Sequence, residues 1–87
     1  MAILSNTQLI YQLLRRPVVE QITSWSRSTL YRNIQKNLFM PPIKLGGGRV
    51  AWLQNEVQAI IQARIVGKSE DEIKELVIQL QAMRGAH

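Results

Sequence analysis

Hydrophobic residues recur three and four positions apart in two neighbouring short segments of this chain. In the first segment, residues 17–23, Val18, Val19 and Ile22 show this spacing and predict a short helix. We expect Pro17 to be its first residue, because proline has no N–H to lose there and its φ is already helical. The polar run Ser24-Trp25-Ser26 then breaks the pattern.

The second segment predicts a helix over residues 27–36. Ser26 is a suitable N-cap, and Leu30 and Ile34 form the stripe that faces the core. At about 100° per residue, Ser28, Arg32 and Gln35 then lie on the opposite, solvent-facing side. Thr29 and Lys36 fall on one flank of this helix and Tyr31 on the other.

A hairpin pattern follows the second helix. The apolar run Leu38-Phe39-Met40 is followed by two prolines, which stop the helix. Residues 43–45 and 49–52 alternate as short strands around Gly46-Gly47-Gly48, a three-residue glycine link typical of a hairpin. A phosphate-binding loop is an alternative for the glycines, but the strand–GxxxxGK[ST]–helix context is absent.

Two more helices are predicted after Leu53. The first has Val57, Ile60, Ile61 and Ile65 on one face and ends at Gly67. Ser69 and Glu72 then form a capping box for a helix over residues 69–84. The apolar face of that last helix comprises Ile73, Leu76, Val77, Leu80 and Met83.

These elements predict one domain that is mainly α with a small β-hairpin wing, a winged helix-turn-helix fold. Residues 1–12 are expected to form either an arm or a short helix that runs into Leu13. Residues 13–66 form the winged helix-turn-helix. The helix over 69–84 either packs on that domain or pairs with a second copy.

Charge is divided unevenly along the chain. The net charge is +5 over 87 residues. Residues 1–53 hold seven basic side chains and one acid, Glu20, whereas residues 54–87 hold four basic side chains and five acids. Cations clustered in this way gain affinity for a polyanion by releasing its counterions, although they also serve simply to keep a small protein in solution.

The remaining composition narrows the function classes. The chain has no Cys, which excludes disulfides and fits a reducing compartment. We find no signal peptide and no apolar run long enough for a bilayer, and therefore expect a cytoplasmic protein that does not contact membranes. The only His is His87, and Asp71 sits with two glutamates in a first helical turn. No catalytic pair or metal cluster emerges, so we predict neither an enzyme nor a cofactor, metal or small-molecule substrate.

The second helix and the wing carry the candidate DNA contacts. Hydroxyl, amide and guanidinium groups are those that bind phosphates and base edges in a major groove, and no acid occurs between Glu20 and Glu56. An ordinary solvated helix face would usually mix charges of both signs. The candidate residues are Arg27, Ser28, Thr29, Tyr31, Arg32, Gln35 and Lys36 on the helix, Lys44 and Arg49 on the wing, and Arg15 and Arg16 before the first helix.

Three aromatic residues have two interpretations. Trp25, Trp52 and Phe39 could stack on bases, but we favour core positions for all three. In that interpretation Trp25 fills the turn between the first two helices, and Trp52 closes the wing onto the third helix.

A family resemblance begins with the run Leu13-Leu14-Arg15, Pro17-Val18-Val19 and residues 26–32. This run resembles the AlpA family of phage-type regulators. Members of that family are winged-helix proteins similar to excisionases and to the MerR DNA-binding fold. The resemblance continues through Phe39, Pro41, residues 44–46, Trp52 and residues 56–57, and covers about residues 13–64. Members usually carry Gly where this chain has Ser24, and often Pro where it has Met40.

The resemblance implies a duplex DNA-binding protein of a prophage or integrative element. Such a protein acts as a transcriptional regulator, as an excisionase, or as both, with an integrase and further copies of itself as partners on DNA. Three alternatives remain open: a protein-interaction module that works through the last helix, a non-specific nucleic-acid binder, and an RNA binder. For the free protein, we favour a monomer that gathers on DNA over a symmetric dimer.

Overall fold

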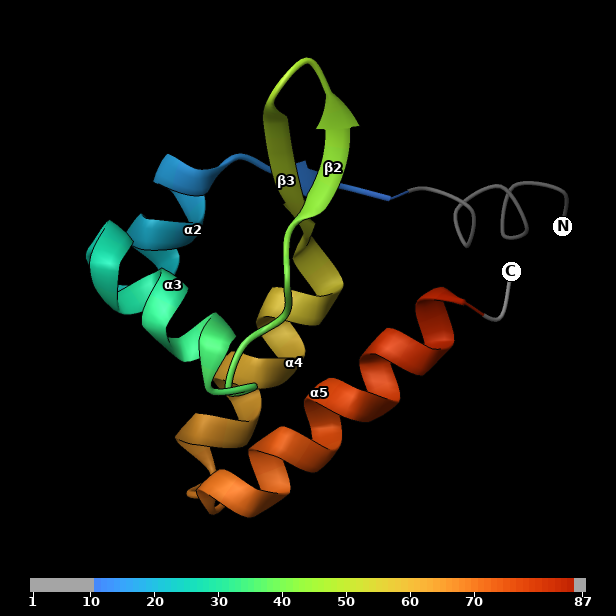
Figure 1. Ribbon diagram of the computed structural model, residues 1–87. Coiled ribbons are helices and arrows are strands. Elements are labelled where there is room, and N and C mark those ends of the chain that lie inside the picture. Colours follow the sequence, from blue (N-terminus) through green and yellow to red (C-terminus); the bar gives the residue numbers. More distant parts are fainter. Residues whose placement is uncertain (1–10, 86–87) are drawn as a thin grey trace, which may run out of the picture.

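The computed structural model describes residues 11–85 of the chain. In order, the elements are β1 (Leu13–Leu14), α2 (Arg16–Thr23), α3 (Arg27–Gln35), β2 (Ile43–Gly46), β3 (Arg49–Leu53), α4 (Gln54–Ile65) and α5 (Glu70–Arg84). Helices α2 and α3 lie beside α4, the β2–β3 hairpin projects beyond the helices, and α5 folds back past α4 (Figure 1). The fold is mainly helical with a hairpin wing, as the sequence predicts.

The wing belongs to a small antiparallel sheet with the strand order β1–β3–β2. Leu13 pairs with Leu53 and Leu14 with Trp52, while Ile43 of β2 pairs with Ala51. Strand β1 was not expected. The prediction of a helix running into Leu13 is therefore wrong, because the backbone there is used to complete the sheet. The rest of the predicted arm or helix, residues 1–10, lies outside the described residues.

The wing tip requires glycine because of its backbone conformation. Gly46, Gly47 and Gly48 have φ angles of +94°, +61° and +77°, a region that side chains with a Cβ rarely adopt. No heavy atom outside the adjoining residues lies within 4 Å of where a Cβ would stand on any of the three. The tip is therefore free of neighbours and is held only by the strands beneath it.

The core fills the space between the sheet and the helices. Trp52, Phe39, Leu30, Met40 and Ile60 are among its largest fully buried side chains. The indole Nε1 of Trp52 donates a hydrogen bond of 2.9 Å to the carbonyl of Met40, which fixes the wing to the segment that follows α3. This confirms the core positions predicted for Trp52 and Phe39.

Fewer residues of each helix are buried in the core than the helical spacing predicts. Val19, Val57 and Ile73 are buried as expected. The predicted core-facing residues Val18, Ile22, Ile65 and Met83 are instead substantially exposed. A domain this small can cover only the middle of each apolar stripe, so the residues at the margins and ends of α2, α4 and α5 remain in contact with solvent.

Helix α5 is capped at its start, packed into the core along its length and bound to α4 at its end. At its start, Ser69 and Glu72 form the predicted capping box. The Ser69 N–H donates a hydrogen bond to the Glu72 carboxylate and lowers its pKa. The nearby charge of Lys68 and the Ser69 hydroxyl lower this pKa further. Along its length Ile73 and Val77 enter the core. At its end the Arg84 guanidinium contacts the Glu56 carboxylate, with an Nη2–Oε1 distance of 2.6 Å.

Candidate nucleic-acid interface

Helix α3 is held in place by its cap and by a single buried leucine. The Ser26 hydroxyl accepts a hydrogen bond from the Thr29 N–H at 3.2 Å, as its predicted N-cap role requires. Leu30 is fully buried, and Ile34 packs beside it against the core. These contacts leave the opposite face of α3 to solvent. Ser28, Arg32 and Gln35 are all exposed on that face.

The turn before α3 has an unusual backbone conformation. Ser24, the C-cap of α2, has φ +61° and ψ +24°, in the left-handed region. This conformation favours glycine over a residue that carries a Cβ. A hydrogen bond from the Trp25 N–H to the Thr23 hydroxyl steadies the turn. The turn can therefore accommodate serine and still direct α3 away from α2.

Trp25 does not enter the core completely. Its ring meets Phe39 edge-on, with centroids 5.4 Å apart and planes at 74°. The guanidinium of Arg64, from the last turn of α4, lies 5.2 Å from the Trp25 ring centroid. The indole is half-buried. Trp25 therefore covers the edge of the core at the turn instead of being enclosed by it.

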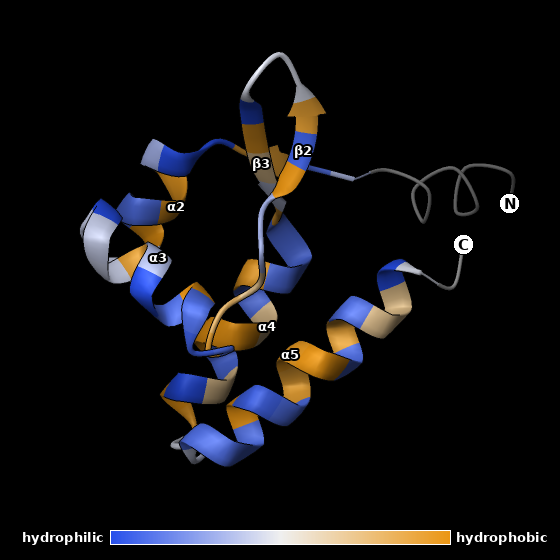
Figure 2. Ribbon diagram, viewed as in Figure 1, coloured by the Kyte–Doolittle hydropathy of each residue, from blue (hydrophilic) through white to orange (hydrophobic). Residues whose placement is uncertain are grey.

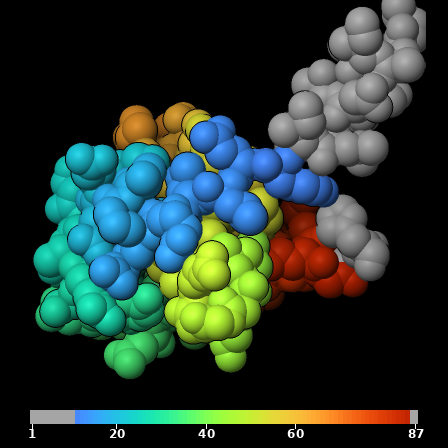
Figure 3. Space-filling model, turned by 90° about the horizontal axis from the view of Figure 1, so that it is seen from above, coloured from blue at the N-terminus to red at the C-terminus, as the bar shows by residue number. Residues whose placement is uncertain are grey.

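Most of the candidate DNA contacts are exposed. Arg27 and Ser28 lie in the first turn of α3, Lys36 caps its end, and Lys44 and Arg49 stand on β2 and β3. Arg15 precedes α2 and is also exposed. Viewed from above, α2, α3 and the wing form a continuous surface, with the C-terminal end of α5 on the far side of the wing from α3 (Figure 3). The structure thus places these side chains on neighbouring elements.

Three of the predicted residues are less free than the rest. Arg16 is partly buried, and its Nε lies 2.9 Å from the Glu20 carboxylate in an i, i+4 ion pair. Tyr31 packs partly against the core. The Thr29 hydroxyl accepts a hydrogen bond from Ser26 at 3.1 Å, which draws it into the helix cap.

Within residues 11–65 there are only two carboxylates, and both are paired. Glu20 is bound by Arg16, and Glu56 is buried against Arg84. The guanidinium of Arg84 also donates to the carbonyl of Pro41 at 3.0 Å. Within the described part of the chain, the surface formed by α2, α3 and the wing therefore carries basic side chains without a free acid. Figure 2 shows hydrophilic residues along α3.

Two features of this region were not found from the sequence. The contact of Arg64 with Trp25 joins residues far apart in the chain, and no local pattern indicates it. The pairing of Glu56 with Arg84 joins residues 28 positions apart, and the sequence pattern identifies Arg84 only as the end of a helix. The sequence did give one signal for this pair: Glu56 lies one position before Val57, on the face of α4 that enters the core.

Other kinds of site receive no support from residues 11–85. In that part of the chain, no group of three His, Cys, Asp or Glu side chains is placed to hold a metal. None of its helices is long and apolar enough to cross a membrane. His87 lies outside the described residues.

The chain resembles known phage proteins in sequence. A family model described as the prophage CP4-57 regulatory protein (AlpA) matches residues 12–65. An uncharacterized protein of Enterobacteria phage P4, ORF88, is 46% identical over 57 residues, which span 66% of this chain and 65% of that relative. No solved structure matches the chain.

Proposed function

The chain belongs to the AlpA family of prophage regulatory proteins, and on that premise we propose that it binds a specific duplex DNA sequence of a prophage or integrative element. In this proposal α3 enters the major groove and the wing contacts the adjacent backbone or minor groove. The bound protein regulates transcription, acts as an excisionase, or does both. The family assignment confirms the resemblance that was drawn from the sequence.

The observation that carries the proposal is the charge of the α2–α3–wing surface. This surface exposes five basic side chains, those of Arg15, Arg27, Arg32, Lys36 and Arg49. The two nearby carboxylates, Glu20 and Glu56, are each paired with a guanidinium of the protein itself. A surface of one sign attracts the phosphate backbone and releases its counterions. The exposed Ser28 and Gln35 add hydrogen-bonding groups that can discriminate base edges.

The domain organisation follows from this proposal. Residues 13–66 form the DNA-binding unit, and the helix over residues 69–84 braces it, since Ile73 and Val77 are buried in the same core. Partners such as an integrase then bind surfaces that DNA leaves free. The protein acts in the cytoplasm, where its DNA target is, and needs no cofactor, metal or small-molecule substrate.

Binding to duplexes over a range of salt concentrations tests the proposal. We expect tighter binding to the attachment-site or promoter DNA of the host element than to random duplex, with log affinity falling linearly as log salt rises. Arg49→Ala should weaken binding and reduce the salt slope by about one counterion. A matched control is Lys74→Ala on α5, which also removes one cation but lies outside the proposed surface.

Two results would count against the proposal. If the protein binds random duplex as tightly as every segment of the element, it is a non-specific binder. If Arg49→Ala and Lys74→Ala change the salt slope equally, the wing is not in contact with DNA.

A further inference from the structure

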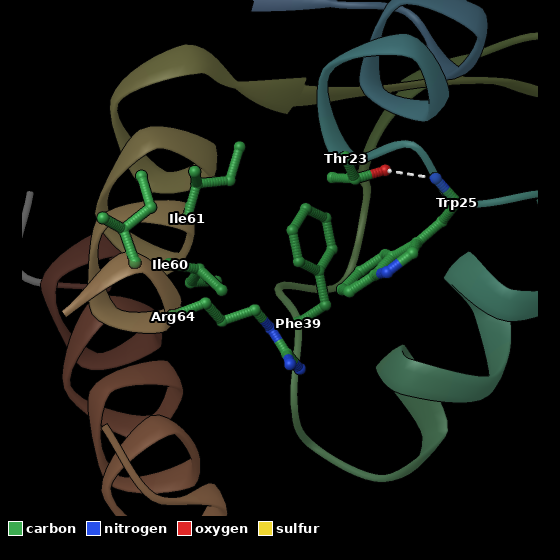
Figure 4. Close-up of a pocket in the computed structure, with 7 residues that line it drawn as sticks. Thr23, Trp25, Phe39, Ile60, Ile61 and Arg64 are labelled. Atoms are coloured by element: carbon green, nitrogen blue, oxygen red, sulfur yellow. Dashed lines mark hydrogen bonds between the residues drawn. The ribbon is translucent and has the colours of Figure 1, made fainter. Parts of the chain in front are cut away.

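A groove of about 280 Å³ opens between α4 and the turn that joins α2 to α3. Its lining is mostly apolar and includes Trp25, Phe39, Ile60, Ile61 and Ile65. The Arg64 side chain extends across it from α4 towards Trp25 and Phe39 (Figure 4). The groove is therefore an apolar hollow with one cation at its edge.

Exposed apolar side chains continue from the groove onto the surface beside it. Ile65 is 72% exposed although it lines the groove, and its neighbour Val66 is 58% exposed. Arg64 is exposed and forms no salt bridge within residues 11–85. An aliphatic side chain with a carboxylate close by would fill this hollow and pair with the free guanidinium.

Helix α5 presents such a combination on its outer side. Ile78 is 60% exposed, and the exposed Glu75 and Asp71 lie three and seven positions before it, on the same outward stripe of the helix. Lys74, four positions before Ile78, borders the stripe on the side towards the core and is partly buried, so the two exposed acids leave the stripe with a net negative charge. Because Ile73 and Val77 on the opposite side of α5 are buried in the core, Ile78 cannot reach the groove of its own chain.

The other exposed apolar side chains of the described residues fit the groove less well. Five of them, Tyr11, Leu13, Val18, Ile22 and Leu45, belong to the basic half of the molecule. The one carboxylate near them is Glu20, which Arg16 already binds. Met83 stands next to Arg84, whose charge is used by Glu56. Charge complementarity therefore selects the outer stripe of α5 as the occupant.

We propose that the groove of one copy receives the outer stripe of α5 from a second copy, with Ile78 in the groove and Glu75 paired with Arg64. The two surfaces are different, so the contact is heterologous and repeats from copy to copy instead of closing into a symmetric dimer. It leaves the α2–α3–wing surface unoccupied. The inference does not depend on DNA binding.

The natural absence of cysteine makes disulfide trapping a direct test. Two full-length variants, Ile65→Cys and Ile78→Cys, are mixed at high protein concentration under mild oxidation, with and without duplex. We expect dimers linking position 65 to position 78 to exceed the dimers of either variant alone. A protein carrying both cysteines should give a ladder of trimers and larger species. Gln58→Cys, exposed on α4 away from the groove lining, replaces Ile65→Cys as the matched control.

Charge reversal tests the ion pair within the same assay. Arg64→Glu or Glu75→Arg should each reduce the trapped dimer about fivefold, and mixing the two reversed chains should restore it. A double-cysteine protein that stops at dimers would overturn the heterologous contact, as would trapping no greater than that of the Gln58→Cys control. Circular dichroism confirms that each variant is folded, and Val66→Cys provides a second rim position if Ile65→Cys is not.

Discussion

The two halves of this molecule use their cations differently. In the half formed by α2, α3 and the wing, Arg27, Arg32 and Arg49 are exposed and face solvent without a carboxylate partner among the described residues. In the half formed by α4 and α5, Arg84 binds a buried carboxylate and Arg64 lies over an indole ring. The three exposed arginines of the first half are thus available to an external partner. In the second half, Arg84 holds two parts of the fold together, while Arg64 covers the Trp25 ring and stays exposed.

The difference shows that charge count alone is a poor guide to function. Both halves contain arginine, but the cost of removing one depends on what it faces. A buried ion pair that loses one partner leaves an uncompensated charge in the core, while an exposed cation contributes little to stability. Substitutions in the two halves should therefore separate folding from binding.

The largest expected effect is on the stability of the α4–α5 half. Arg84→Ala leaves the Glu56 carboxylate buried without its partner and also removes the hydrogen bond to the Pro41 carbonyl. We expect the free energy of unfolding to fall by about 3 kcal/mol, measured by urea denaturation. Replacing both Glu56 and Arg84 with Met should recover most of this loss. A single variant as stable as the parent would show that the pair is not a structural contact.

A second substitution should affect binding and not folding. Arg32→Ala removes an exposed guanidinium from the outer face of α3, so we expect the melting temperature to stay unchanged. Affinity for the specific duplex should fall by the equivalent of about 1–3 kcal/mol, and affinity for random duplex by much less. Fluorescence anisotropy with both duplexes measures the two effects. Equal losses on both would reassign Arg32 to a phosphate contact.

The turn between α2 and α3 offers a gain in stability. Ser24 has a positive φ of 61°, which costs a residue with a Cβ more than it costs glycine. Ser24→Gly should raise the free energy of unfolding by up to about 1 kcal/mol, because relief of that strain exceeds the extra flexibility of the unfolded chain. Ser26→Gly is unsuitable as a control because it removes the cap, so Ser28→Gly on the exposed face of α3 is used. That variant should be destabilised.

The smallest effect is expected for the ion pair on α2. Glu20→Gln weakens a partly buried i, i+4 contact that still touches solvent, and stability should change by less than about 0.5 kcal/mol. The substitution also frees Arg16 and removes one negative charge, so the net charge of the proposed DNA-binding surface rises by one. Affinity for random duplex at low salt should therefore rise slightly. An unchanged affinity together with a large loss of stability would place this pair with the structural contacts of α4 and α5.

The sequence predicted the elements whose signals are local. The cap at Ser26, the glycine link of the wing and the Ser69–Glu72 capping box each depend on residues within a few positions of one another, and each is found in the structure. The exposed outer face of α3 followed from helical geometry once Leu30 was recognised as its buried anchor. The family resemblance was found for the same reason, since its motifs are short and ordered along the chain.

The features that the sequence did not predict depend on contacts between distant segments. Strand β1 is only two residues long and exists because β3 offers it an edge, so Leu13 and Leu14 carry no strand pattern of their own. The groove beside Arg64 arises where three segments meet. The exposure of Ile65 and Met83 reflects how little of the surface a small domain can cover, which hydrophobic spacing does not reveal.

The bond between Arg84 and the Pro41 carbonyl has a consequence for the order in which the molecule is made. Synthesis on the ribosome proceeds from the N-terminus, so the loop before the wing and the Glu56 carboxylate emerge well before the residue that secures them. A chain interrupted before residue 84 retains every proposed DNA contact but holds an unpaired charge in its core. Such fragments should be recognised by cellular proteases, so that the protein that persists in the cell consists mainly of chains translated past this point.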